Sequence, residues 1–214
     1  MATSRDLGIS SQVTLQEIEA AIDVAGLRPL PPAALEQLLS YLHLLLRWNS
    51  QLNLTADRRP TDVIRRHLVE CVQCAQELPS LETLLDFGSG AGLPGIPIAI
   101  VRPEIRVTLG ESQGKKTAFL REAVRTLSLT AEVFDKRIET MPQGRTFEAV
   151  TLRAVDRMAA ACQAALPRVT TGGWLILFAT SNTEPSFQQL PNITWVRRIQ
   201  MASLEDGLLL MGQK

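Results

Sequence analysis

The segment that most constrains the fold is LLDFGSGAGLPG, which spans residues 84–95. A short apolar run ends at Phe87, and four glycines and a proline lie between it and Ile96, where apolar residues resume. Glycine adopts backbone dihedrals that are closed to other residues and lets the main chain approach a ligand. Such a turn between a strand and a helix is typical of a ligand site at the carboxyl end of a strand in a doubly wound α/β sheet. A tight turn that binds nothing is the alternative.

Strand-like and helix-like segments alternate from about residue 81 to residue 180. The expected strands are TLLDF, RVTLGE, AEVFD, FEAVTLRAV and GGWLILFAT. The expected helices are Gly95–Val101, Lys115–Leu127 and Asp156–Leu166. This alternation predicts βαβ units and a parallel sheet. Two later segments, NITWVRRIQM and LEDGLLLMG, are expected to close the fold as a hairpin.

The first part of the chain has a helical pattern without strands. Three amphipathic helices are expected, over about residues 14–26, 31–52 and 60–77. Thr14 and Glu17 have the spacing of a capping box at the start of the first helix. Residues 1–12 are expected to be a loose terminus. We therefore expect a helical N-terminal extension over residues 1–80, facing RNA, and an α/β domain over residues 81–214, within one compact unit.

The composition is that of a folded protein with one domain, or one domain with a small helical cap. Of the 214 residues, 45% are apolar and 21% are charged, and the formal net charge is zero. A neutral chain has no broadly basic surface, so any patch that binds nucleic acid must be local. We find no N-terminal signal sequence and no apolar run of membrane-spanning length. We expect a soluble, cytoplasmic protein.

The three cysteines are Cys71, Cys74 and Cys162. Cys71 and Cys74 form a C-x-x-C pair inside a helical apolar pattern, and one such pair cannot complete a tetrahedral metal site. We therefore expect buried packing thiols and no bound metal.

The glycine turn favours a cationic ligand without phosphates. A P-loop would end in Gly-Lys-Ser/Thr, which is missing here. A dinucleotide fingerprint can be read from Gly90 to Gly95, but Pro94 removes an N–H donor and Asp86 places an anion near the pyrophosphate. S-adenosylmethionine, with a sulfonium, an ammonium and a ribose, fits better than NAD. Glu111 follows the second strand, about 20 residues on, where an acid binds a ribose. NAD would also use this acid, and a solvated carboxylate is the alternative.

Four stretches in a fixed order are distinctive: WNSQLNLT (48–55), DFGSGAGLPGIPIAIVRPE (86–104), ESQGKKTAFL (111–120) and LRAV (152–155). They resemble the family of bacterial ribosomal RNA small-subunit methyltransferase G, also called glucose-inhibited division protein B. The resemblance implies a Rossmann-like S-adenosylmethionine-dependent methyltransferase fold, with a mostly parallel, seven-stranded sheet and a helical N-terminal extension. It also implies methylation of N7 of one guanosine in 16S ribosomal RNA.

The resemblance also assigns residues to the cofactor, S-adenosylmethionine. These residues are Gly88, Leu93, Glu111, Ser112, Ile138, Glu139 and Arg153. Asp86 and Gly90, which belong to the glycine turn, are expected at the cofactor as well. Glu111 with Ser112 would meet the adenosine part. Ile138 with Glu139 would border the adenine. Arg153 would lie beside the cofactor and the target base, and it is the candidate catalytic residue.

The chain departs from the family pattern at several places. Glu70-Cys71 stand where Asp-Ser is usual, and Gly110 stands where a large aliphatic residue is usual. Ala179-Thr180 replace the usual Lys-Gly, and Lys214 alone remains of the basic residues of the last strand. These departures fall mainly in the half of the site expected to face RNA.

Methylation at N7 needs no general base, because this nitrogen carries an exposed lone pair. The protein has to hold the nucleophile in line with the methyl carbon and the sulfur. Methylation makes the base cationic, so we expect Arg153 to contact a phosphate or the cofactor carboxylate rather than the ring. A structural ion pair with Asp156 is the alternative.

Basic residues near the third helix form the candidate RNA surface. The residues expected to contact phosphates are Arg58, Arg59, Arg65, Arg66, Lys115 and Lys116. A solvated polar face is the alternative, because Asp57 and Asp62 are interspersed. His67 and Trp48 lie in apolar patterns and are expected in the core, although the Trp48 ring could stack on a base.

We expect a monomeric enzyme whose partner is 16S ribosomal RNA or the small ribosomal subunit, and neither DNA nor a membrane. Two alternatives stay open. One is a methyltransferase for another RNA, a protein or a small molecule. The other is a cofactor-binding scaffold without catalysis, which the replaced Lys-Gly and the neutral net charge leave open.

Overall fold

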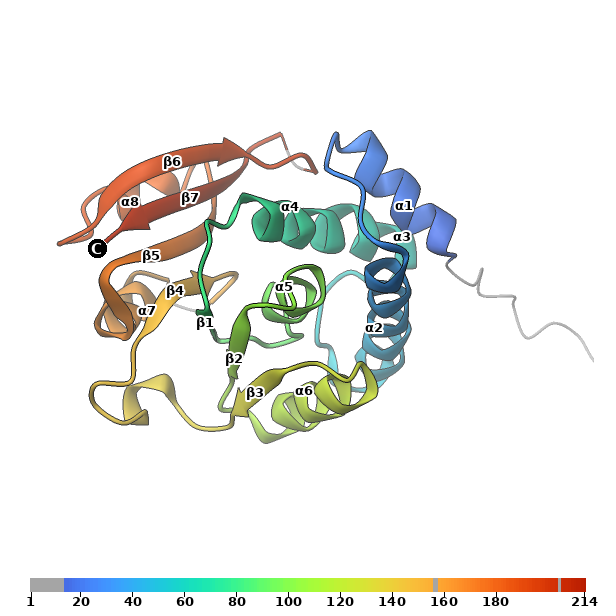
Figure 1. Cartoon of the computed structure of the whole chain (residues 1–214), viewed down its shortest axis with the longest axis horizontal. Helices are drawn as coiled ribbons and strands as arrows, with labels where there is room; N and C mark the ends of the chain where they lie inside the picture. The colour runs from blue at the N-terminus through green and yellow to red at the C-terminus, as the bar shows by residue number, and fades with distance from the viewer. Residues whose placement is uncertain (1–13, 156–157, 204) are drawn as a thin grey trace, which may run out of the picture.

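The computed structural model describes residues 14–155, 158–203 and 205–214, which form a sheet covered by helices (Figure 1). The strands are β1 Thr83–Phe87, β2 Arg106–Gly110, β3 Ala131–Phe134, β4 Phe147–Leu152, β5 Val169–Thr180, β6 Thr194–Gln200 and β7 Gly207–Gln213. Their order across the seven-stranded sheet is β3-β2-β1-β4-β5-β7-β6. The first five strands in this order are parallel, and β7 is antiparallel to both β5 and β6. The predicted parallel sheet with a closing hairpin is confirmed. The expectations for residues 1–12 and for Asp156 lie outside the described residues.

The position of β1 in the sheet determines where a ligand can bind. β1 pairs with β2 on one side and with β4 on the other. The strand order therefore reverses between β1 and β4. In sheets of this kind, the crevice beyond the carboxyl ends of the strands at such a reversal binds ligands.

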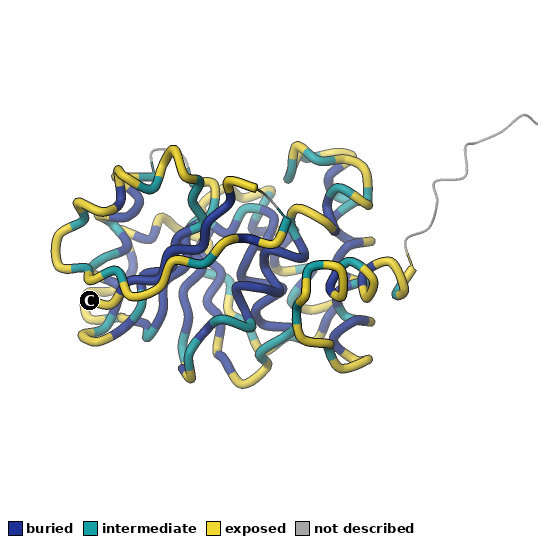
Figure 2. Tube along the Cα trace, turned by 90° about the horizontal axis from the view of Figure 1, so that it is seen from above, coloured by how far each residue is buried: buried dark blue, intermediate teal, exposed yellow. Residues whose placement is uncertain are grey.

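Both faces of the sheet are covered, and β1 shows this directly. Leu84 belongs to the core on one face, whereas Leu85 and Phe87 belong to the core on the other. The helices that follow β1 are α5 Gly95–Val101, α6 Gly114–Thr126, η2 Ile138–Thr140, α7 Met158–Ala165, η3 Leu166–Arg168 and α8 Glu184–Phe187. Helices α5 and α6 pack on the first face, and α7, α8 and η2 on the second. The central strands are consequently buried, as Figure 2 shows and as a parallel sheet requires.

The N-terminal helices are α1 Leu15–Val24, α2 Pro32–Leu52, α3 Pro60–Asp62, the π-helix η1 Val63–Leu68 and α4 Val69–Glu77. The capping box is confirmed, since the Glu17 N–H donates to Thr14 Oγ1 at 3.3 Å and the Thr14 N–H donates to Glu17 Oε2 at 2.8 Å. The expected third α-helix is interrupted, because residues 63–68 form a π-helix in which the Val69 N–H donates to the Ile64 carbonyl. An apolar pattern cannot reveal one extra residue in a turn, so sequence analysis missed this feature.

The N-terminal helices share one core with the sheet rather than forming a separate layer. Leu38, Leu42 and Leu45 of α2 belong to the same cluster of buried residues as Leu84 of β1. The buried Tyr41 hydroxyl donates to the Ala91 carbonyl in the glycine turn at 2.7 Å. The helical extension therefore supports the turn directly.

The remaining core expectations also agree with the structure. All three cysteines are buried, and burial raises the pKa of Cys71 to about 12 and that of Cys162 to about 11. Trp48 packs edge-on against Phe119, with ring centroids 5.8 Å apart, and its indole N–H donates to Glu122 at 3.1 Å. Trp48 is thus a packing residue.

Candidate active site

The turn after β1 has the left-handed backbone that its glycines permit. Gly88, Gly90 and Gly92 have φ of +73°, +54° and +82°, a region that residues with a Cβ seldom adopt. The N–H groups of Gly88 and Ser89 each donate to the Gly110 carbonyl at 2.9 Å. The turn therefore folds over the end of β2.

Asp86 lies beneath this turn and holds it. Its side chain is buried, Oδ2 accepts the Gly95 N–H at 3.2 Å, and Oδ1 accepts the Thr151 hydroxyl at 2.9 Å. A Cβ at Gly95 would lie 2.7 Å from Asp86 Oδ2, so only glycine leaves room there. Burial raises the pKa of Asp86 to about 6, although the hydrogen bonds lower it. Asp86 thus joins β1, β4 and the start of α5 from below the ligand side.

A cleft of about 400 Å³ lies at the carboxyl ends of β1, β2 and β4. It is lined by Phe87, Gly88, Gly110, Glu111, Ser112, Gln113, Lys116, Lys136, Arg137, Ile138, Glu139, Ala154 and Val155. This volume is within the range of pockets that bind small molecules. The lining includes five of the expected cofactor residues, which are Gly88, Glu111, Ser112, Ile138 and Glu139. It does not include Asp86, Gly90, Leu93 or Arg153.

Glu111 has a fixed carboxylate at the edge of this cleft. Its Oε2 accepts the Gly90 N–H at 3.1 Å, and its Oε1 accepts the Gln113 N–H at 2.8 Å. Each carboxylate oxygen has a second lone pair that can accept a ligand hydroxyl. Gly90 therefore acts through Glu111, although it does not line the cleft itself.

Ile138 covers the floor of the cleft above Gly110. A Cβ at Gly110 would lie 2.4 Å from Ile138 Cδ1 and 3.3 Å from the Asp86 carbonyl oxygen. The glycine that departs from the family pattern therefore makes room for the Ile138 side chain. The apolar surface of Ile138 suits an aromatic ring of a ligand.

Arg153 is directed away from the cleft and into the N-terminal helices. Its Nη2 donates to Glu70 Oε2 at 2.5 Å and to His67 Nδ1 at 2.7 Å. Its Nη1 donates to Cys71 Sγ at 3.6 Å, and its guanidinium lies 5.3 Å from the centre of the Phe178 ring. The side chain of Arg153 is only 12% exposed. Arg153 thus forms an ion pair with Glu70, whereas the partner considered from the sequence, Asp156, lies outside the described residues. Contact of Arg153 with a phosphate or with the cofactor carboxylate stays a prediction.

His67 continues this network toward the surface. Arginine can only donate, so His67 Nδ1 must be the acceptor and Nε2 must carry the proton. Nε2 lies 3.1 Å from Asp57 Oδ2 and 3.0 Å from Thr55 Oγ1. Burial, and then the charge of Arg153, lower the pKa of His67 to about 4, although Asp57 raises it. His67 is therefore neutral near pH 7.

Three of the expected RNA-contacting residues have polar partners within the helical extension. Arg58 donates to Asn53 Oδ1 at 2.8 Å, Arg59 pairs with Asp62 at 2.6 Å, and Arg66 pairs with Asp57 at 3.4 Å. Lys115 is exposed at the start of α6, and Lys116 lines the cleft. The cleft lining contains two further cations, Lys136 and Arg137, and neither forms an ion pair with the described part of the chain.

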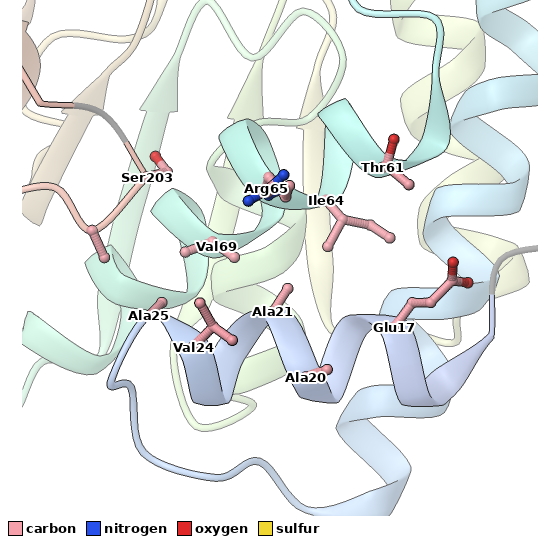
Figure 3. A pocket seen from close by; sticks show the side chains of 11 residues that line it. Glu17, Ala20, Ala21, Val24, Ala25, Thr61, Ile64, Arg65, Val69 and Ser203 are labelled. Atoms are coloured by element: carbon pink, nitrogen blue, oxygen red, sulfur yellow. The ribbon is translucent and has the colours of Figure 1, made fainter.

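Arg65 lies in a second groove, of about 400 Å³, between α1, the π-helix and the loop after β6 (Figure 3). Ala20, Ala21 and Val24 of α1 face Ile64 and Val69 across it, and Ser203 lies at its edge. The Ser203 hydroxyl donates to Glu70 Oε1 at 2.7 Å. The groove thus borders the network around Arg153.

Within residues 14–155, 158–203 and 205–214, no three His, Cys, Asp or Glu side chains are grouped so that they could hold a metal ion. Among the helices of those same residues, none has the length and apolar character needed to cross a membrane.

Sequence analysis missed two residues that shape the site. The sequence marks Glu70 only as a departure from the family pattern, and it gives Tyr41 no special place. A carboxylate three residues after His67 was the available signal for Glu70, because residues three apart share a helix face. Nothing in the sequence connected Tyr41 to the glycine turn.

The sequence matches the model of a family described as rRNA small subunit methyltransferase G over residues 34–204. The chain is 47% identical over 123 residues to the ribosomal RNA small subunit methyltransferase G of Xanthomonas euvesicatoria pv. vesicatoria, a match that covers 57% of this chain and 58% of that protein. The chain therefore spans less than two thirds of that relative. The chain is also 41% identical over 172 residues to the protein of the same name from Xylella fastidiosa. This match covers 80% of this chain and 76% of that protein.

The fold also has solved counterparts. A SAM dependent methyltransferase from Aquifex aeolicus superposes with a TM-score of 0.57 and 16% identity, over 71% of this chain and 92% of that chain. This similarity establishes that the chain has the fold of SAM-dependent methyltransferases.

Proposed function

The chain belongs to the rRNA small subunit methyltransferase G family, and from this premise we propose that it transfers a methyl group from S-adenosylmethionine to N7 of one guanosine in 16S ribosomal RNA. The observation that carries the proposal is the cleft at the carboxyl ends of β1, β2 and β4, with the carboxylate of Glu111 fixed at its edge.

The residues of this cleft fit the cofactor. Gly88 lines the cleft without a side chain, so an approaching ligand meets bare main chain there, and an added Cβ would lie 3.2 Å from Val155 Cγ2. Glu111, with Ser112 beside it, would accept the ribose hydroxyls. Ile138, with Glu139 beside it, would border the adenine. Asp86 and Leu93 would act from below, by holding the turn.

The bound cofactor supplies a methyl group on a positively charged sulfur. The protein needs to bind and orient the two reactants, because N7 has a free lone pair and no proton must leave before it attacks. In the transfer, the S–C bond would break as the N–C bond forms, and the positive charge would pass from sulfur to the base. The positive charge of Arg153 does not oppose this transfer, because the Glu70 carboxylate neutralises the guanidinium, with Oε2 lying 2.5 Å from Nη2. We therefore propose a supporting role for Arg153 in place of a direct catalytic one.

The RNA would lie across the helical extension, residues 1–80, and the mouth of the cleft. Arg58, Arg59, Arg65 and Arg66 would contact phosphates on the extension, and Lys115 and Lys116 would do so at the cleft. The zero net charge favours a structured substrate, because affinity must come from several local contacts and from shape. We therefore propose the small ribosomal subunit as the partner, a monomeric enzyme, no role for DNA or a membrane, and action in the cytoplasm.

Two measurements test this function. Calorimetric titration should detect binding of S-adenosylmethionine and not of NAD. Incubation with methyl-labelled cofactor and small subunits from cells that lack their own enzyme should place the label on a single guanosine, at which the RNA then cleaves after reduction and aniline treatment. Label on an exocyclic amine, a ribose or a cytosine would contradict the N7 assignment. Tight cofactor binding without any labelled RNA would favour the non-catalytic scaffold.

A further inference from the structure

One wall of the cleft is a strained segment that needs support. Ala154 and Val155 line the cleft, and Ala154 has φ of +49°. A residue with a Cβ pays conformational energy in this region and stays there only where its surroundings hold it. Ala154 is itself exposed, so its own side chain provides little of that support.

The support comes from Arg153, the preceding residue. Its guanidinium is held by Glu70 at 2.5 Å and by His67 at 2.7 Å, and it packs over Phe178. These partners belong to α4, the π-helix and β5. A side chain held from three elements fixes the position of its own backbone.

Glu70 is in turn held by both of its carboxylate oxygens. Oε2 pairs with Arg153, and Oε1 accepts the Ser203 hydroxyl at 2.7 Å. Glu70 is 4% exposed, so water does not compete for either oxygen. The carboxylate therefore has one well-defined position, and so has the guanidinium that it binds.

We propose that Glu70 and His67 are positioning residues for the cofactor cleft: through Arg153 they hold the wall formed by Ala154 and Val155, so the helical extension controls cofactor affinity. The proposal rests on the proposed function and adds a role for the extension besides contact with RNA. Neither residue lines the cleft, so the effect is exerted through the position of the wall.

The first test compares Glu70→Gln with Glu77→Gln. Glu77 is a matched control, because it lies on the same helix and pairs with Arg197 of β6, away from the cleft. Calorimetry with S-adenosylmethionine and with its demethylated product should show about tenfold weaker binding for Glu70→Gln, the size expected for loss of wall ordering, and wild-type binding for Glu77→Gln. Hydrogen exchange of residues 153–155, measured without ligand, should accelerate in Glu70→Gln alone.

A second variant separates positioning from stability. The double change Glu70→Leu with Arg153→Met replaces the buried ion pair by apolar side chains of similar size, which commonly keeps a protein folded. The proposal requires wild-type unfolding temperature together with weakened cofactor binding and faster exchange at 153–155. Glu70→Asp, which keeps the carboxylate, should bind the cofactor more tightly than Glu70→Gln.

The outcomes distinguish this proposal from the proposed function. If the wild-type chain does not bind S-adenosylmethionine, the proposed function fails, and the exchange measurement still tests the wall. Wild-type affinity and wild-type exchange in the folded Glu70→Leu, Arg153→Met variant would overturn the positioning role.

Discussion

Replacing His67 by Asn should change how the stability of the protein responds to acid. The Asn amide oxygen can take the place of Nδ1 as the acceptor for Arg153, while the titrating ring is removed. The charged groups that face His67 are Arg153, Asp57 and Arg66, and all of them remain in the variant.

The sign follows from the two pKa values of His67. The folded chain protonates His67 near pH 4, whereas the unfolded chain does so near 6.5. The stability from neutral His67 is therefore present above pH 6.5 and is lost as the pH falls toward 4. At 1.36 kcal/mol per pKa unit, the loss between pH 7 and pH 4 is about 3 kcal/mol.

Asp86 acts in the opposite direction. Its folded pKa, about 6, lies above its ordinary value of 3.8. Asp86 therefore binds its proton earlier in the folded chain, and the free energy of unfolding rises by about 2 kcal/mol between pH 7 and pH 4. The contributions of His67 and Asp86 to the pH dependence of the free energy of unfolding largely cancel in the wild-type chain, so neither is visible there.

Urea unfolding followed by tryptophan fluorescence at pH 7 and pH 4 should reveal the two opposing contributions of His67 and Asp86. On acidification, His67→Asn should gain about 3 kcal/mol relative to the wild type, and Asp86→Asn should lose about 2 kcal/mol relative to it. All other carboxylates are common to the three proteins and cancel in the comparison. A parallel response of His67→Asn and wild type, within about 0.5 kcal/mol, would refute the neutral-histidine assignment.

Three further changes test the cleft and the RNA surface. Glu111→Ala should weaken S-adenosylmethionine binding by about 1–3 kcal/mol in calorimetry, because a charged hydrogen-bond acceptor is lost; unchanged affinity would remove the ribose assignment. Gly110→Ala should lower the free energy of unfolding by about 1–3 kcal/mol in urea, because its Cβ displaces Ile138, and Ile138→Val should relieve this in the double variant; a fully stable single variant would show that Ile138 moves freely. Changing Arg58, Arg59, Arg65 and Arg66 together to Ala should flatten the dependence of log RNA affinity on log salt by about 0.7–0.9 per lost phosphate contact, with cofactor affinity unchanged. An unchanged slope would identify these arginines as a solvated face.

The sequence predicted those parts of the fold that local patterns encode. The alternation of strands and helices, the glycine turn and the acid after β2 depend on residues near one another in the chain. Glu111 was assigned to the cleft because the end of the second strand has a known place in such a sheet. Local pattern and final structure agree at these positions.

The parts that were missed depend on contacts between distant residues. Glu70 and Arg153 are 83 positions apart, and Tyr41 and Ala91 are 50 apart. No periodicity records such a pair, so the sequence predicts neither the ion pair between Glu70 and Arg153 nor the contact of Tyr41 with the glycine turn. The contacts of Asp86 are not readable from the sequence for a related reason, since its partners Gly95 and Thr151 meet it only when the sheet has formed.

The π-helix has a consequence for how this chain tolerates changes in length. An α-helix turns by about 100° and rises about 1.5 Å per residue. Deleting one residue within 63–68 would let the segment relax into a continuous α-helix, and the residues on either side would keep nearly their present directions, because a π-helical turn holds one residue more than the α-helical turn that replaces it. A deletion within the α-helix that follows, Val69–Glu77, would instead rotate everything after it by about 100°. The π-helix is therefore the place where this helical segment can lose one residue while Glu70 keeps its direction toward Arg153.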